Sequence, residues 1–245
     1  MADIRQNLEW WKGYDWTSQG ESWSAAWGGS DAQFFASILP RIRMYIPSKN
    51  ILEIAPGFGR WTQYLINFSD EYTGIDLNEE CVTHCKNRFS NSGSDVNFYA
   101  NDGKSLANIK DDSVDFVFSF DSLVHANAEV LEAYLEQLKN KFTTEGVGFF
   151  HHSNLGSFPE RGDSTSNHYR DEVVTSDLFK TICERHGLVC ISQEVINWGG
   201  DKLIDCLSVF TMPSSSYKKD YAYIENNKFM EEASYIRELS SIYRR

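Results

Sequence analysis

The chain has 245 residues, of which 35 are Asp or Glu and 23 are Lys or Arg, so its formal net charge at pH 7 is −12. Nucleic acids are bound mainly through Lys and Arg side chains that neutralise phosphates, and an acidic chain without a Lys/Arg cluster longer than Arg244–Arg245 disfavours a nucleic-acid partner. Hydrophobic residues at 41% and aromatic residues at 14% indicate a globular protein with a core and exclude a mainly disordered chain.

No apolar run approaches the roughly 20 residues that a membrane-spanning helix needs. The N-terminal segment also lacks the basic and then apolar order of a signal peptide. Both observations predict a cytoplasmic protein without a membrane span. The five cysteines agree with this prediction, because an odd number at irregular spacing is not a disulfide framework.

The N-terminal segment is rich in tryptophan. Five of the seven tryptophans precede residue 30, among Gly, Ser and acidic residues, which is too aromatic for a tail and too irregular for a strand. Ser30, followed three residues later by Gln33, forms a capping-box pattern, and apolar residues then recur at helical spacing as far as Tyr45. We therefore predict an aromatic and helical cap over residues 1–48, with a helix from about Asp31 to Tyr45.

From Asn50 onward, short apolar runs alternate with amphipathic stretches, a pattern typical of βαβ units and a parallel sheet. The runs predicted as strands cover residues 50–55, 72–77, 96–101, 114–120, 147–152, 188–195 and 203–212. Helices are predicted near residues 61–67, 79–89, 130–142 and 177–186. Only residues 197–202 separate the last two strands, which is hairpin length and leaves no room for a crossover helix. The order predicted is five parallel strands followed by an antiparallel hairpin.

Two further segments are a loop and a tail. The loop over residues 153–174 is long for a compact domain and polar, which is typical of a lid or an acceptor loop. The tail, residues 214–245, is predicted to be a linker followed by an amphipathic helix from about Tyr221, since apolar residues recur at spacings of three and four. These residues are Phe229, Ala233, Ile236, Leu239 and Tyr243. The helix either folds back on its own domain or pairs with a second copy, and its near-heptad spacing favours a homo-oligomer.

A glycine-rich turn follows the first predicted strand. The segment LEIAPGFGR, residues 52–60, places Glu53, Gly57 and Gly59 at a strand-to-helix turn. Glycines there let the backbone approach a ligand, and the next helix offers free N–H groups. The third glycine of the dinucleotide fingerprint would fall at Thr62, so this turn and the final hairpin disfavour a dinucleotide oxidoreductase.

Polar residues end the next three strands. Asp76 ends the second strand, where an acidic side chain can accept hydrogen bonds from both hydroxyls of a ribose. Residues 101–103, Asn-Asp-Gly, end the third strand, where an adenine amino group would lie. Residues 119–121 end the fourth strand. The carboxyl ends of parallel strands meet at one edge, so these residues are predicted to share a site.

With these motifs, residues 51–212 resemble the class I S-adenosylmethionine-dependent methyltransferases. The resemblance implies an α/β, Rossmann-like fold over residues 49–213. Its seven-stranded sheet would have an antiparallel last strand, helices on both faces, the N-terminal aromatic cap and the C-terminal helix. Gly57 and Gly59 would line the methionine moiety of S-adenosylmethionine, while Asp76 would bind the ribose and Asp102 the adenine amino group. The complete set implied to bind the cofactor is Glu53, Ala55, Gly57, Gly59, Arg60, Asp76, Leu77, Asn101, Asp102, Gly103 and Ser119.

Methyl transfer to a hydroxyl needs a held acceptor and a base that removes the hydroxyl proton, and histidine suits that task at neutral pH. His125 follows the fourth strand, and His151 and His152 end the fifth, at the edge where open α/β sheets bind ligands. Since side chains alternate along a strand, at most one of His151 and His152 faces the site. We predict His125 and His152 as catalytic residues, with Asp121 orienting a histidine. His151 and His168 are the alternatives.

A divalent metal is a separate possibility for the site. Magnesium prefers carboxylate oxygens, and some sugar methyltransferases use it. The residues that would gather around it are Asp121, His125, His152 and Asp163. No spacing in the sequence requires a metal, and we predict none.

Aromatic and planar polar side chains favour a carbohydrate-like acceptor. Rings for stacking would come from Trp16, Trp23, Trp27 and Trp198. Hydrogen bonds to hydroxyls or to a phosphate would come from Asn154, Arg161 and Arg170. The sequence therefore predicts an O-methyltransferase of a small polar acceptor, such as a sugar or glycan. An N-methyltransferase of a metabolite or peptide and a non-catalytic cofactor-binding domain are the alternatives.

Overall fold

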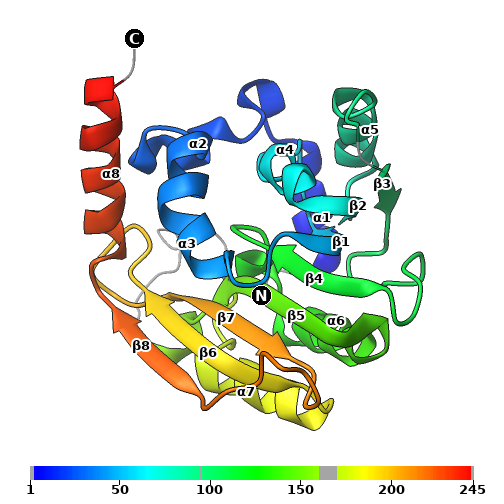
Figure 1. Ribbon diagram of the computed structural model, residues 1–245. Helices are drawn as coiled ribbons and strands as arrows, with labels where there is room; N and C mark the ends of the chain where they lie inside the picture. The colour runs from blue at the N-terminus through cyan, green and yellow to red at the C-terminus, as the bar shows by residue number, and fades with distance from the viewer. Residues whose placement is uncertain (1–2, 94, 160–169, 244–245) are drawn as a thin grey trace.

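The computed structural model describes residues 3–93, 95–159 and 170–243. These residues form one eight-stranded sheet in the order β3-β2-β1-β4-β5-β7-β6-β8 (Figure 1). The strands are β1 (Ser48–Ile54), β2 (Ser69–Asp76), β3 (Asp95–Ala100), β4 (Val114–Ser119), β5 (Phe142–Ser153), β6 (Val189–Ile196), β7 (Asp205–Thr211) and β8 (Ala222–Asn226). β7 is antiparallel to both of its neighbours, β5 and β6, and all other neighbouring strands are parallel. The Rossmann-like order and the antiparallel hairpin are as predicted.

The predicted number of seven strands is wrong, because the tail supplies an eighth. β8 pairs with β6 in parallel, from Ser192↔Ala222 to Ile196↔Asn226. Most of its side chains are exposed, so it shows no alternation of apolar and polar residues that a sequence could reveal. Its place in the sheet comes from backbone pairing at the edge of β6. The tail helix therefore begins at Phe229 and not near Tyr221.

Helices cover both faces of the sheet, which confirms that prediction (Figure 1). α6 (Ala128–Lys141) and α7 (Ser176–Arg185) pack on one face. α4 (Thr62–Leu65), α5 (Glu79–Arg88) and the N-terminal segment pack on the other. Within the described ranges, no helix is long and apolar enough to cross a membrane.

The N-terminal segment is a series of short helices. α1 (Ile4–Lys12) is followed by two 3₁₀-helices, and then α2 (Ser30–Gln33) and α3 (Leu39–Ile42) flank a π-helical turn (Phe34–Ile38). The helix predicted from about Asp31 to Tyr45 is therefore interrupted in its middle. Pro40 lies two residues after the interruption, in the first turn of α3, and has no backbone N–H to donate to the preceding turn.

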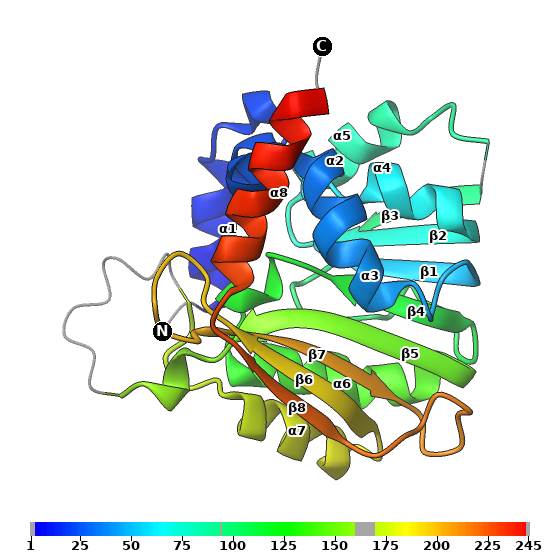
Figure 2. The same ribbon diagram turned by 60° about the vertical axis from the view of Figure 1, so that its left-hand side comes forward.

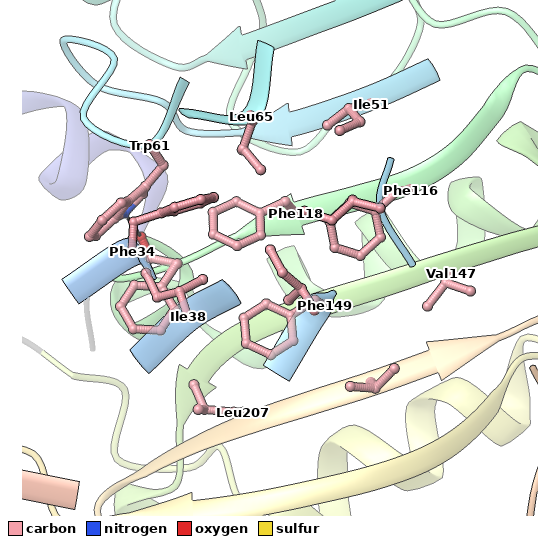
Figure 3. Close-up of a cluster of buried hydrophobic side chains, with 14 of the residues drawn as sticks. Phe34, Ile38, Ile51, Trp61, Leu65, Phe116, Phe118, Val147, Phe149 and Leu207 are labelled. Carbon is pink, nitrogen blue, oxygen red and sulfur yellow. Dashed lines mark hydrogen bonds between the residues drawn. The ribbon is translucent and has the colours of Figure 1, made fainter. Parts of the chain in front are cut away.

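The cap shares one hydrophobic core with the sheet. Phe34 and Ile38 from the cap belong to the same cluster as Phe118 and Phe149 from β4 and β5, and all four are at most 1% exposed (Figure 3). The rings of Phe118 and Phe149 stack with centroids 5.7 Å apart. Each such side chain contributes roughly 1.5–3 kcal/mol on burial, so the cap is held by the sheet itself. The boundaries at residues 48 and 213 stay predictions.

The tail helix, α8 (Phe229–Tyr243), lies beside the cap (Figure 2). The ring centroids of Phe229 and Trp27 are 5.6 Å apart, and Ala233 is completely buried. The far end of the predicted apolar stripe turns outward, and Tyr243 is 84% exposed. The first turns of α8 therefore dock within the chain. Self-association through its exposed end stays a prediction.

An ion-pair network ties the cap to β6 and α8. Arg41 donates from Nε and Nη2 to the two oxygens of Glu194, both at 2.8 Å, and from Nη1 to Glu232 Oε1 at 3.0 Å. Burial acts to raise the pKa of Glu194, but the hydrogen bonds and charge of Arg41 outweigh it and hold this pKa below the usual value. The charged form of Glu194 therefore stabilises the folded state.

The substitution Glu194→Gln should lower the free energy of unfolding by about 1.5–3 kcal/mol at pH 7, since it removes a charge-assisted partner of Arg41. The folded-state pKa of Glu194 is depressed, so its contribution is present above its unfolded value of about 4.3 and is lost as the pH falls. Urea denaturation should show that the difference in the free energy of unfolding between the variant and the wild type is smaller at acidic pH than at pH 7. The exposed Glu184→Gln serves as the control, and a gap independent of pH would contradict the electrostatic explanation.

Candidate functional site

Two adjoining cavities open at the carboxyl ends of β1, β2 and β4, between the strand-end turns and the cap. Residues that line the first cavity include Ile4, Asn7, Trp11, Trp16, Trp23, Ala55, Gly57, Arg60, Asp76, Leu77, Gly103, Asp121, Ser122, His125 and Tyr134. The second cavity is lined by Trp11, Trp23, Asp121, His125, Arg170 and Trp198. The shared residues are Trp11, Trp23, Asp121 and His125. A ligand in one cavity would therefore border a ligand in the other.

Asp76 joins the end of β2 to the glycine-rich turn after β1. Its Oδ2 accepts from the Gly57 N–H at 3.0 Å, and its Oδ1 accepts from the Asn78 N–H at 2.8 Å. Burial raises the pKa of Asp76 to about 6, although the backbone N–H groups act to lower it. Ala55 takes a left-handed φ of +58° at the start of the turn. The turn thereby brings Ala55, Gly57, Asp76 and Leu77 to one cavity wall.

The two predicted glycines serve different contacts. Gly57, with φ +59°, lines the first cavity, and a Cβ there would lie 3.1 Å from the ring of Trp16 in the cap. Gly59, with φ +85°, lies against the C-terminal end of α5, where a Cβ would lie 2.5 Å from the ring of Phe89. Gly59 is therefore required for packing beneath the turn and is not among the residues lining the cavity.

Glu53 lies beneath the turn and supports it. The side chain is 1% exposed and accepts hydrogen bonds from Thr62 Oγ1 at 2.7 Å and from the hydroxyl of Tyr72. Burial raises the pKa of Glu53 to about 7, although these two hydrogen bonds lower it. The carboxyl group does not line either cavity.

The residues after β3 divide between cavity and surface. Gly103 lines the first cavity directly under the cap, since a Cβ there would lie 2.9 Å from Ile4 Cγ2. Asn101 accepts from the Gly103 N–H at 3.0 Å and donates to Tyr134 Oη at 3.1 Å. Asp102 is exposed and accepts from two backbone N–H groups of its own turn. The structure therefore brings Gly103 to the site and leaves the side chains of Asn101 and Asp102 outside the lining.

Asp121 follows β4 with a left-handed φ of +59° and lies between the two cavities. Its Oδ2 accepts from Arg60 Nη2 at 2.7 Å. The Arg60 guanidinium also lies over the rings of Trp61 and Trp23, at 4.4 and 5.1 Å from their centroids. Ser119 is buried behind this loop, where its hydroxyl donates to a backbone carbonyl of β1 at 3.0 Å.

His125 and His151 lie on the site side of the sheet. His125 lines both cavities, with its ring centroid 5.2 Å from that of Trp11. His151 is fully buried beside the Asp121 loop, where its Nδ1 accepts from the Asp121 N–H at 3.1 Å. His125 and Asp121 thus line the same two cavities, and the role of Asp121 in orienting a histidine stays a prediction.

His152 points to the other face of the sheet, and its prediction as a residue facing the site is wrong. Its ring stacks on Phe179 of α7, with centroids 4.2 Å apart, and is completely buried. Nδ1 donates to the carbonyl of Ser153, and Nε2 bonds to Ser208 Oγ, both at 2.8 Å. Burial lowers the pKa of His152 to about 4. Strand alternation makes His151 the residue on the site side, and His168 lies outside the described residues.

Only some of the residues predicted to bind the acceptor line the second cavity. Trp23, Trp198 and Arg170 line the second cavity. Trp27 is a core residue between α8 and Trp198, and Asn154 donates to the carbonyl of Leu203. Arg161 lies outside the described residues.

The sequence did not reveal the residues of α1 that line the first cavity, or Asp205, which binds the side chain of Arg170. Ile4, Asn7 and Trp11 from α1 line the cavity. The tryptophan-rich composition was the available signal, but it did not show which ring faces the sheet. Asp205 lies under the second cavity and accepts from Arg170 Nε at 2.5 Å and from Nη2 at 2.7 Å. No local pattern marks this pair.

The four residues considered as metal ligands do not gather at one place in the structure. His152 lies on the opposite face from Asp121 and His125, and Asp163 lies outside the described residues. Across the part of the chain that the structure describes, no group of three or more His, Cys, Asp or Glu residues could hold a metal ion.

Comparisons with known proteins agree with the geometry. Residues 51–146 match the model of a methyltransferase-domain family. The sequence matches no curated protein. The fold resembles a Pyrococcus horikoshii OT3 protein, with a TM-score of 0.61 and 16% identity over 83% of this chain and 98% of that one. It also resembles an S-adenosylmethionine-dependent methyltransferase from Clostridium acetobutylicum, with a TM-score of 0.58 and 13% identity over the same shares.

A Leishmania major S-adenosylmethionine-dependent methyltransferase aligns with a TM-score of 0.60 and 11% identity, over 85% of this chain and 82% of that one. These structural likenesses show the fold, and the family match adds the kind of domain. The fold is Rossmann-like, and residues 51–146 within it match a methyltransferase domain. Solved structures that share this fold thus include S-adenosylmethionine-dependent methyltransferases from two organisms.

Proposed function

We propose that the protein transfers a methyl group from S-adenosylmethionine to a hydroxyl of a small polar acceptor, a sugar or glycan. The observation that carries the proposal is the second cavity. Three tryptophan rings, from Trp11, Trp23 and Trp198, surround it, and His125 and Asp121 border both it and the first cavity. Aromatic faces suit the C–H faces of a sugar ring, while the polar groups lie where a reacting hydroxyl would have to be.

The first cavity fits the adenosyl and methionine parts of the cofactor. The Asp76 carboxylate accepts two backbone N–H groups, and its remaining lone pairs can accept the ribose hydroxyls. Leu77 and Ile4 supply apolar walls for the adenine ring beside Gly103. Ala55 and Gly57 leave the backbone open toward the methionine moiety. The positions of these residues support placing the ribose, the adenine and the methionine moiety in the first cavity.

In the proposed reaction, the cofactor supplies a methyl group on a positively charged sulfur, which is the electrophile. The tryptophan rings of the second cavity would hold the acceptor with its hydroxyl toward the first cavity, where the cofactor would supply the methyl group. His125, which lines both cavities, would take the proton that the acceptor hydroxyl loses on methylation. Asp121, held by Arg60, would border the same space as the histidine that takes the proton.

The proposal predicts methyl transfer to polyhydroxyl acceptors. Incubation with methyl-labelled S-adenosylmethionine and a panel of sugars, sugar nucleotides and lipid-linked glycans should label at least one acceptor, with mass spectrometry placing the methyl group on oxygen. A parallel panel of amines and peptides tests the N-methyltransferase alternative. Labelling of amines alone would replace the proposed acceptor class. Cofactor binding without transfer to either panel would favour a non-catalytic domain.

A further inference from the structure

A buried chain of polar groups connects the second cavity to the Asp121 loop. Arg170, which lines that cavity, forms a two-point ion pair with Asp205. Asp205 Oδ2 lies 3.1 Å from His151 Nε2, and His151 Nδ1 lies 3.1 Å from the Asp121 backbone nitrogen. His151 and Asp205 are both fully buried. The chain therefore joins residues from four separate segments, and its two ends, Arg170 and Asp121, line the second cavity.

The hydrogen-bond geometry selects one tautomer of His151. A backbone N–H can only donate, so the Nδ1 that receives the Asp121 N–H carries no proton. The ring proton is then on Nε2, which donates to Asp205. Both ring nitrogens are thus occupied, and the rings of Phe120 and Trp198 lie 4.7 and 5.1 Å from the imidazole centroid. His151 has no nitrogen left to take a proton from an acceptor.

Asp205 is suited to hold this tautomer because it stays ionised. Burial acts to raise its pKa, but the charge and hydrogen bonds of Arg170 outweigh burial and hold the pKa well below the usual range. An ionised carboxylate can only accept, so it orients Nε2–H toward itself. Arg170 and Asp205 together leave no net charge in the buried pair.

The last link explains an unfavourable backbone conformation. Asp121 is not glycine, yet its φ is +59°, a region that costs a non-glycine residue on the order of 1–2 kcal/mol. The bond to His151 satisfies the N–H in that conformation and so favours it. The same conformation presents the Asp121 carboxylate to Arg60, between the two cavities.

We infer that His151 is a positioning residue: held in one tautomer by Asp205 and Arg170, it fixes the Asp121 loop and thereby the carboxylate at the border between cofactor and acceptor. This inference deepens the proposed function and rests on it only for its effect on turnover. The fixed backbone of Asp121 can be measured without any acceptor.

Two substitutions separate the two bonds of His151. In His151→Asn, the side-chain oxygen can take the place of Nδ1, so the acceptor for the Asp121 N–H is kept while the contact with Asp205 is lost. In His151→Gln, the longer side chain reaches toward Asp205, and the acceptor for Asp121 is lost. Thermal unfolding of both variants, followed with bound S-adenosylhomocysteine, reports whether the fold and the cofactor site remain intact.

The decisive measurement is exchange of the Asp121 amide hydrogen. We expect slow exchange in the wild type and in His151→Asn, and exchange faster on the order of tenfold or more in His151→Gln. Nitrogen-15 NMR of the wild type should show His151 protonated on Nε2 only. Once an acceptor is known, kcat of His151→Gln should fall about 10- to 100-fold while cofactor affinity is retained.

Protonation of Nδ1 in the wild type would overturn the inference, and this measurement needs no variant. Equal exchange of the Asp121 amide in the wild type and in a folded His151→Gln would also overturn it. Failure of the acceptor panels would leave both measurements intact, so the proposed function and the positioning role can fail separately.

Discussion

Replacing Asp76 with Ala should lower the affinity for S-adenosylmethionine by about tenfold or more. The substitution removes the proposed acceptor for two ribose hydroxyls, each bond being worth roughly 1.5–3 kcal/mol when charge-assisted. It also frees the Gly57 N–H, which the carboxylate holds at 3.0 Å in the turn. Calorimetry with S-adenosylhomocysteine measures the loss, and unchanged affinity would place the ribose elsewhere.

Asp102→Ala is the matched comparison, because the resemblance to methyltransferases assigned this residue to the adenine amino group. The structure leaves its side chain exposed and bonded to its own turn. We expect a far smaller loss of affinity than for Asp76→Ala. A comparable loss would mean that the side chain turns inward when the cofactor binds.

The affinity for the cofactor should also depend on pH. Burial raises the pKa of Asp76 to about 6 in the free protein. The ionised form is the stronger acceptor, so binding should weaken as the pH falls below about 6, and bound ribose should in turn lower this pKa. In Asp76→Asn this dependence should disappear.

The second large effect is expected at His125. If His125 removes the hydroxyl proton, His125→Ala should reduce turnover by about 10² to 10⁴-fold while leaving the binding of S-adenosylhomocysteine nearly unchanged. The limb of the pH–rate profile that reports deprotonation of the base should be lost with it. Turnover is measured on an acceptor from the labelled panel.

His152→Ala provides the contrast, because sequence reasoning placed both histidines in the site. His152 is packed on Phe179 behind the sheet. Its removal should lower the free energy of unfolding while the turnover of the folded protein stays near that of the wild type. Near-native turnover in His125→Ala, with cofactor binding intact, would show that the base lies elsewhere or that catalysis is by positioning alone.

The sequence by itself determined seven strands of the sheet and their direction. Buried strands need apolar residues, and a linker of hairpin length cannot form a parallel crossover, so both features are readable from local pattern. The eighth strand was not readable. β8 joins the edge of β6 through backbone hydrogen bonds, which leave no requirement on its exposed side chains.

For the candidate site, the sequence indicated which residues lie at the same edge of the sheet. Gly57, Asp76 and Asp121 end or follow neighbouring strands, and the parallel arrangement alone brings such residues to one edge. Only the tertiary structure decided which side chains face the cavities. Glu53 and Gly59 lie in the same turn as Gly57, yet they support it from beneath.

Two further features were set by the tertiary structure: which histidine of β5 faces the site, and which residue pairs with Arg170. Sequence alternation required His151 and His152 to face opposite ways, but the choice between them came from which face of β5 the cap covers and which face α7 covers. The pairing of Arg170 with Asp205 joins residues that no local spacing relates. Local periodicity encodes which residues are buried, whereas partners distant in sequence are set by the packing of whole elements, and these partners orient the groups of the site.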